Sequence, residues 1–117
     1  MATFEKSNQH LVRAEKTIPL GSQTFSKSRT QYPVGISPLF MHKAKGCHTW
    51  DIDGNKFLDC PMGLTSVSLG HAYEPVLEKV IEVINKGANF QRPSIIELEM
   101  AEKFLSLVPQ HDMIKFA

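Results

Sequence analysis

The fold of this chain is decided by the stretch CHTWDIDGNKFLDC, residues 47–60. Two short runs of alternating apolar and polar residues meet there at Asp53-Gly54-Asn55. Because glycine accepts the positive φ that a tight turn requires, the pattern predicts a β-hairpin. The carboxylates Asp51, Asp53 and Asp59 are interpreted as solvated hairpin residues and not as an acid–base pair. A calcium loop is excluded, since an EF-hand needs glycine at its sixth position, where this stretch has none.

A short helix and a long loop are expected before the hairpin. The segment Asn8 to Lys16 suits a helix that Ser7 or Asn8 caps and that ends before Pro19. From Ile18 to Phe40 the chain is rich in proline, glycine, serine and threonine, yet it also carries several aromatic and branched side chains. Such a loop is too apolar for a disordered segment and is expected to pack on something.

Two helices are expected after the hairpin. Between Pro75 and Lys86 apolar residues recur every three or four positions, and Gly87 provides a stop. The pattern Ser94-x-x-Glu97 is typical of a capping box that opens a second helix, which Pro109 closes. Residues 113–117 are predicted to begin a strand. The sequence therefore predicts an α+β fold.

Composition excludes several classes of protein. The 117 residues have a formal net charge of +1, and their basic residues are scattered, so a nucleic-acid surface is not expected. No apolar run reaches the roughly 18 to 20 residues of a membrane span, and the N-terminus lacks the apolar core of a secretory signal, so a cytoplasmic location is expected. Cys47 and Cys60 are interpreted as buried thiols and not as a disulfide or metal ligands.

No catalytic centre is visible from residue spacing alone. His71 is interpreted as a turn histidine that bonds local backbone, because no nucleophile with an orienting partner lies near it in the sequence. Trp50 is interpreted as a core residue. Neither a phosphate-binding glycine pattern nor a spacing of metal ligands occurs.

A family resemblance adds to this interpretation. The residues Ala44-Lys45-Gly46, the hairpin from Trp50 to Asp59, and Gly70-His71-Ala72 at their spacing resemble the N-terminal signature of class III aminotransferases. Within this family the chain is most similar to glutamate-1-semialdehyde aminomutase-like enzymes, on the residues Pro19-Leu20-Gly21 and Gly87-Ala88-Asn89-Phe90. The resemblance covers nearly the whole chain from about Ile18 onward.

The resemblance implies a homodimeric fold-type I enzyme that uses pyridoxal 5'-phosphate (PLP) and a small amino-acid-like or amino-sugar-like substrate. After the N-terminal helix expected within 1–17, the resemblance implies a loop and hairpin of the small domain (18–69), two helices leading to the large domain (70–112), and a first strand of that domain (113–117). The phosphate-binding turn and the Schiff-base lysine are expected beyond Ala117. This chain is therefore expected to hold no catalytic or cofactor-binding residue, to bind PLP poorly by itself and to be inactive alone.

Two positions depart from the aminomutase pattern. Aminomutases usually have Asn-Ser where this chain has Gln23-Thr24, and a tryptophan where it has Leu64. The resemblance places Thr24 and Leu64 on the substrate side, so another amino donor and acceptor are as much expected as glutamate semialdehyde. An alternative hypothesis is a stand-alone, non-catalytic interaction module that docks on an aminotransferase subunit.

Overall fold

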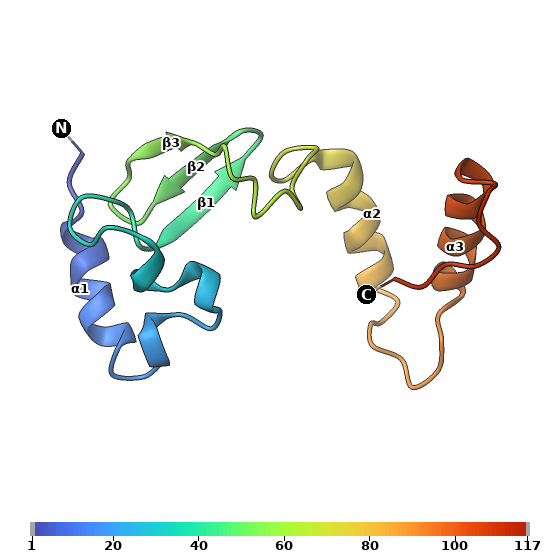
Figure 1. The fold of residues 1–117 in the computed structure, drawn as a ribbon, viewed down its shortest axis with the longest axis horizontal. Coiled ribbons are helices and arrows are strands. Elements are labelled where there is room, and N and C mark those ends of the chain that lie inside the picture. Colours follow the sequence, from blue (N-terminus) through green and yellow to red (C-terminus); the bar gives the residue numbers. More distant parts are fainter. Residues whose placement is uncertain (1, 117) are drawn as a thin grey trace. The chain divides into compact units, whose positions relative to one another are not determined.

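The computed structural model describes residues 2–116 and has the α+β architecture expected from the sequence. The chain divides into two units, one up to Leu77 and one from Glu78 onward, so the division falls within the second helix. The helices and strands of the described residues are α1 (Glu5–Ala14), β1 (Met41–Lys45), β2 (His48–Asp51), β3 (Lys56–Leu58), α2 (Glu74–Ile84) and α3 (Ile95–Leu107) (Figure 1).

The predicted hairpin is confirmed. Strands β2 and β3 pair antiparallel, with His48 opposite Leu58 and Trp50 opposite Lys56. Gly54 in the connecting turn has a φ of 93°, which is the reason for glycine at this position. Trp50 is half-buried and is therefore not a core residue. Its ring lies 4.9 Å from the ammonium group of Lys43 and 5.4 Å from that of Lys56.

Strand β1 was not predicted from the sequence. It pairs antiparallel with β2 and places Ala44 opposite Thr49, so the three strands form one sheet in the order β1-β2-β3. Its sequence MHKAK contains no β-branched residue and gives little strand signal. The strand forms because β2 presents an unpaired edge, a property of the neighbouring segment that the sequence of β1 does not contain.

The predicted start of α1 is wrong. The helix begins at Glu5 and not at Asn8, and Phe4 at its N-cap provides no side-chain hydrogen bond. The first-turn N–H groups of Lys6 and Ser7 donate instead to the carboxylate of Asp53, at 2.7 and 3.0 Å. The capping residue therefore comes from the hairpin turn, and Asp53 is not the solvated residue that the sequence suggested.

The two helices after the hairpin are confirmed, with small shifts of their ends. The predicted capping box of α3 is present, because the N–H of Ser94 donates to Glu97 Oε1 at 2.9 Å and the N–H of Ile96 donates to Ser94 Oγ at 3.3 Å. Gly87 follows the end of α2 with a φ of 109°. These signals depend on neighbouring residues only, which is why the sequence reveals them.

The expected strand at 113–117 is not present in the described residues. Residues 113–116 have no regular structure, and Ala117 lies outside the described residues. A strand exists only through hydrogen bonds to a neighbouring strand, and within residues 2–116 no segment pairs with these residues.

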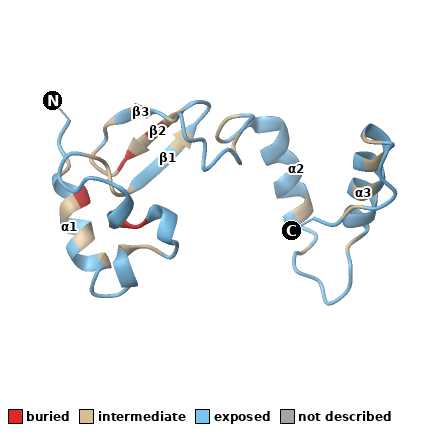
Figure 2. Ribbon diagram, viewed as in Figure 1, coloured by how far each residue is buried: buried red, intermediate tan, exposed pale blue. Residues whose placement is uncertain are grey.

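Few of the described residues are buried, as the short red segments of the ribbon show (Figure 2). None of them is apolar; the buried side chains are those of Ser7, Ser28, Thr49 and Asp51. The prediction of buried thiols is wrong, because Cys47 and Cys60 lie beyond the paired ends of the strands and are exposed. Within residues 2–116 no helix has both the length and the apolarity to span a membrane.

Candidate functional site

Thr24 lies in the loop between α1 and β1, directly before a 3₁₀ turn at Phe25–Lys27. Its carbonyl oxygen accepts a hydrogen bond from the N–H of Lys27 at 3.1 Å, and its side chain is exposed. An ion pair between Arg29 and Glu15 connects the loop to the end of α1. This ion pair ties the loop to α1, but the apolar side chains of the loop are not buried, with Phe25 68% and Ile36 76% exposed, so the expected packing of the loop is not confirmed. Thr24 is exposed as well.

Leu64 lies in an unusual turn after β3. Four consecutive residues have positive φ: Met62 (46°), Gly63 (58°), Leu64 (61°) and Thr65 (71°). The left-handed region costs an L-residue about 1–2 kcal/mol, and a β-branched residue such as Thr65 is rarely found there. The side chain of Leu64 is 68% exposed. The turn therefore carries backbone strain without the burial of an apolar side chain at Leu64 to offset it.

Asp59 and His71 lie on either side of the segment that contains this turn, and their side chains form a pair. Asp59 Oδ2 lies 2.5 Å from His71 Nε2, and Asp59 Oδ1 accepts a hydrogen bond from the N–H of Met62 at 3.1 Å. The prediction that His71 bonds only local backbone is corrected, because its side chain contacts a carboxylate twelve residues away. The backbone of His71 also pairs with Gly46, through hydrogen bonds of 2.8 and 2.9 Å.

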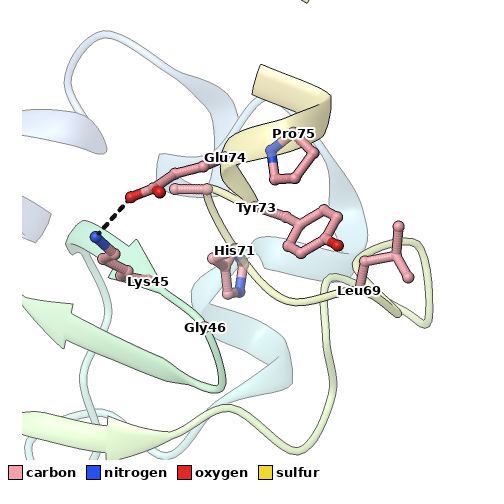
Figure 3. Close-up of a pocket in the computed structure, with 8 residues that line it drawn as sticks. Lys45, Gly46, Leu69, His71, Tyr73, Glu74 and Pro75 are labelled. Carbon is pink, nitrogen blue, oxygen red and sulfur yellow. Dashed lines mark hydrogen bonds and ion pairs between the residues drawn. The ribbon is translucent and has the colours of Figure 1, made fainter. Parts of the chain in front are cut away.

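Two cavities of about 260 Å³ each lie beside this pair. The first has Lys45 and Glu74 at its edge, joined by a hydrogen bond of 3.4 Å, with Tyr73 and Leu69 nearby (Figure 3). The second extends along the turn after β3. Gly46, Leu69 and His71 line both cavities, whereas neither Thr24 nor Leu64 lines either one.

The pair is not a catalytic dyad with a nucleophile. The thiol of Cys47, which lines the second cavity, lies 3.4 Å from His48 Nδ1 and makes no hydrogen bond to His71. Serine and cysteine nucleophiles require a base within hydrogen-bond reach. Within residues 2–116 no group of three or more histidine, cysteine or acidic side chains could hold a metal ion. The Asp59–His71 pair therefore positions backbone, through the N–H of Met62 and the two hydrogen bonds to Gly46.

The carboxylates of the hairpin bind backbone and side-chain donors within the chain. Asp51 is only 1% exposed and accepts hydrogen bonds from the backbone N–H and the side-chain amide of Asn55, at 2.7 and 2.8 Å. The interpretation of Asp51 as solvated is therefore wrong. Desolvation acts to raise the pKa of Asp53, but the N–H groups of Lys6 and Ser7 outweigh it, so the pKa of Asp53 is lowered.

On α2, hydrogen bonds from Lys79 and Lys86 lower the pKa of Glu82 to about 2, and their positive charges add to this effect. Lys79 lies three residues before Glu82 on α2, and Lys86 lies four residues after Glu82, in the turn that follows the helix. All three are at least half exposed, which makes this a solvated surface and not a binding site.

Comparison with known proteins identifies the family. The model of the aminotransferase class-III family matches residues 31–117. A glutamate-1-semialdehyde 2,1-aminomutase of Flavobacterium johnsoniae is 40% identical over 113 residues, which are 97% of this chain and 26% of that protein. The chain thus spans about a quarter of the length of the curated relative it matches.

Solved structures agree with this match. An omega-transaminase from Sphaerobacter thermophilus has a TM-score of 0.79 at 26% identity, covering 92% of this chain and 23% of that one. The PLP internal aldimine form of the FumI protein of Sphingopyxis sp. MTA144 has a TM-score of 0.83 at 25% identity, covering 93% of this chain and 26% of that one. The fold, the signature hairpin and the sequence match agree, and the chain belongs to the class-III aminotransferase family.

Proposed function

We propose that these residues are part of a PLP-dependent enzyme that transfers an amino group, as an aminotransferase or as an aminomutase. The observation that carries the proposal is the family match over residues 31–117, supported by 40% identity to an aminomutase over nearly the whole chain. A small amino-acid-like or amino-sugar-like substrate, a homodimer and a cytoplasmic location complete the proposal.

The N-termini of α1 and α3 are not free to bind the phosphate of PLP. A phosphate group binds well at a helix N-terminus with free N–H groups. Here the carboxylate of Asp53 occupies the first turn of α1, and the capping box of Ser94 and Glu97 occupies that of α3. The one lysine beside the cavities, Lys45, is 72% exposed at the side chain and pairs with Glu74. We therefore assign no cofactor contact and no proton-transfer step to any residue of this chain.

The role proposed for the chain is that of scaffold, dimer interface and substrate-side wall, with a loop and hairpin of the small domain at 18–69 and two helices leading to the large domain at 70–112. Thr24 and Leu64 are proposed to face the substrate. Two properties support this role: both side chains are exposed, and both lie on irregular segments, which often carry binding residues. Leu64 in addition lies in a strained turn, and backbone strain clusters at functional positions.

The experiment that tests the proposal uses the protein encoded by the complete reading frame that contains these codons. It should show the absorption of a lysine-bound PLP and should transfer an amino group between an amino donor and a carbonyl acceptor. A protein that binds no PLP would refute the proposal. If the reading frame ends at Ala117, the docking-module hypothesis is favoured, and binding to a separate aminotransferase subunit becomes the measurement.

The substrate-side role is tested in the same protein. Thr24→Val and Leu64→Ala are expected to change kcat/KM for the amino substrate by about tenfold, the scale of one lost contact in a substrate pocket. The absorption of bound PLP should stay unchanged. Leu107→Ala is the matched control, because Leu107 is 69% exposed on α3 and is given no substrate contact. Equal effects of Leu64→Ala and Leu107→Ala would contradict the assignment of Leu64.

A further inference from the structure

The segment 60–70 is closed at its base by contacts to one turn of the sheet. At its start, the N–H of Asp59 donates to the carbonyl of Cys47 at 2.8 Å. At its end, the backbone of His71 makes two hydrogen bonds with Gly46. The side chains of Asp59 and His71 join the two ends at 2.5 Å. Both ends are thus fixed to the turn formed by Gly46 and Cys47.

Within the segment, backbone hydrogen bonds oppose the backbone strain. Thr65 donates its N–H to the carbonyl of Pro61 at 3.1 Å, and Val67 donates to that of Met62 at 3.0 Å. Of the apolar side chains of the segment, Leu64 and Leu69 are each 68% exposed, and Val67 is half-buried beside the second cavity. A strained backbone persists only where the surrounding structure determines it, so the contacts at the base of the segment contribute to holding it.

The side chains of Asp59 and His71 are suited to holding the strained segment at its base. The exposure of the side chain is 14% for Asp59 and 24% for His71, so water competes poorly for their hydrogen bond. Asp59 also reaches into the strained turn itself, because its second oxygen accepts the N–H of Met62. One carboxylate therefore links the closing residue His71 to the first residue of the left-handed turn.

We infer that Asp59 and His71 are positioning residues that clamp the segment 60–70 in its left-handed conformation and so set where Leu64 lies. The inference deepens the proposed function, because the use of the clamp rests on the proposal that Leu64 faces the substrate. The existence of the clamp does not rest on that proposal, because hydrogen exchange measures the clamp without substrate. If Leu64 proves to lie away from the substrate, Asp59 and His71 still hold the segment, but they do not position a substrate contact.

The test is amide hydrogen exchange in the protein encoded by the complete reading frame that contains these residues, with His71→Ala, His71→Gln and a matched control, His111→Ala. His111 is exposed and lies outside the segment. Glutamine places an amide donor near the position of His71 Nε2 and can still bond the carboxylate, whereas alanine cannot. We expect His71→Ala to speed exchange at Thr65 and Val67 at least tenfold, and His71→Gln to restore most of the protection.

The hairpin amides of Asp51 and Ile52, which donate to Asn55 and Phe40, report whether the first unit stays folded. Exchange that rises in the segment but not in the hairpin, together with rescue by glutamine and no effect of His111→Ala, supports the clamp. Unchanged exchange at Thr65 and Val67 in His71→Ala would overturn it. Equal loss of protection in hairpin and segment with both His71 variants would also overturn it, since His71 would then be needed for the whole fold.

Discussion

Single residues in this chain act over long distances in the sequence, and Asp53 is the clearest case. Its carboxylate caps α1 from the hairpin turn, which lowers its pKa below the usual value of 3.8. A carboxyl group with a lowered folded-state pKa stabilises the fold above its unfolded pKa and loses that contribution as the pH falls through the folded value.

We therefore predict that protection of the Lys6 and Ser7 amides is complete at neutral pH and is lost only at a pH below 3.8. A nuclear magnetic resonance titration of the Asp53 carboxyl would measure this directly. Asp53→Ala should remove the protection at neutral pH, whereas Asp112→Ala, at an exposed aspartate, should not. An Asp53 that titrates at or above its usual value would contradict the capping role.

Residues of this kind limit what the sequence can predict about the site. Asp53 is 46 residues from Ser7, and Asp59 is twelve from His71. No spacing rule joins such pairs, because the fold brings them together. Both carboxylates were therefore interpreted as solvated and His71 as a local turn residue. The Asp-Gly turn located the hairpin correctly but gave no sign of what its carboxylates bind.

At the scale of elements, local signals determine local structure. The capping box of α3 is one of them, and its removal has a calculable effect. Ser94→Ala should cost about 1 kcal/mol of helix stability, the usual value for a lost N-cap. Circular dichroism should show reduced helix content. Ser106→Ala is the control, because Ser106 Oγ bonds back to Lys103 within α3, and its loss is expected to be neutral or slightly stabilising. Equal effects would contradict the role of the cap.

The left-handed turn at 62–65 gives a second prediction at this scale. Thr65 has a φ of 71°, so Thr65→Gly should relieve strain of about 1–2 kcal/mol, less about 0.5–1 kcal/mol for the greater freedom of glycine in the unfolded chain. A small net gain in the free energy of unfolding is expected. Ser68→Gly, at a neighbouring exposed residue outside this group of positive φ values, should instead be destabilising. A loss of stability on Thr65→Gly would show that the turn is not strained.

The elements that sequence reasoning missed share one physical cause. Strand β1 and the true start of α1 depend on partners elsewhere in the chain, the edge of β2 and the carboxylate of Asp53. The hairpin, the capping box and the stop at Gly87 depend on adjacent residues and were predicted. Residues 113–116 had the sequence of a strand, yet without a pairing partner in the described residues they form none.

At the scale of the whole molecule, the dominant feature is exposed apolar surface. Along α2 the side chains of Val76, Leu77, Val80, Ile81 and Ile84 are 44–59% exposed, and no apolar side chain in the described residues is buried. Contiguous apolar surface drives association. We predict that the 117-residue chain associates at rising concentration, as measured by sedimentation. Replacing Val80 and Ile81 by serine should weaken the association. Replacing the exposed, charged Lys79 and Glu82 by serine should not weaken it. A strictly monomeric chain with a sharp melting transition would contradict this prediction.

Our central proposal is that these residues are part of an amino-transferring enzyme and do not contain its cofactor lysine. The most direct test is to incubate the 117-residue chain with PLP, reduce any Schiff base with borohydride, and map the labelled lysines by mass spectrometry. Urea-denatured chain serves as the control. We predict slow labelling spread over the exposed lysines, no more selective than in the denatured chain. Stoichiometric labelling of one lysine in the folded chain alone would contradict it.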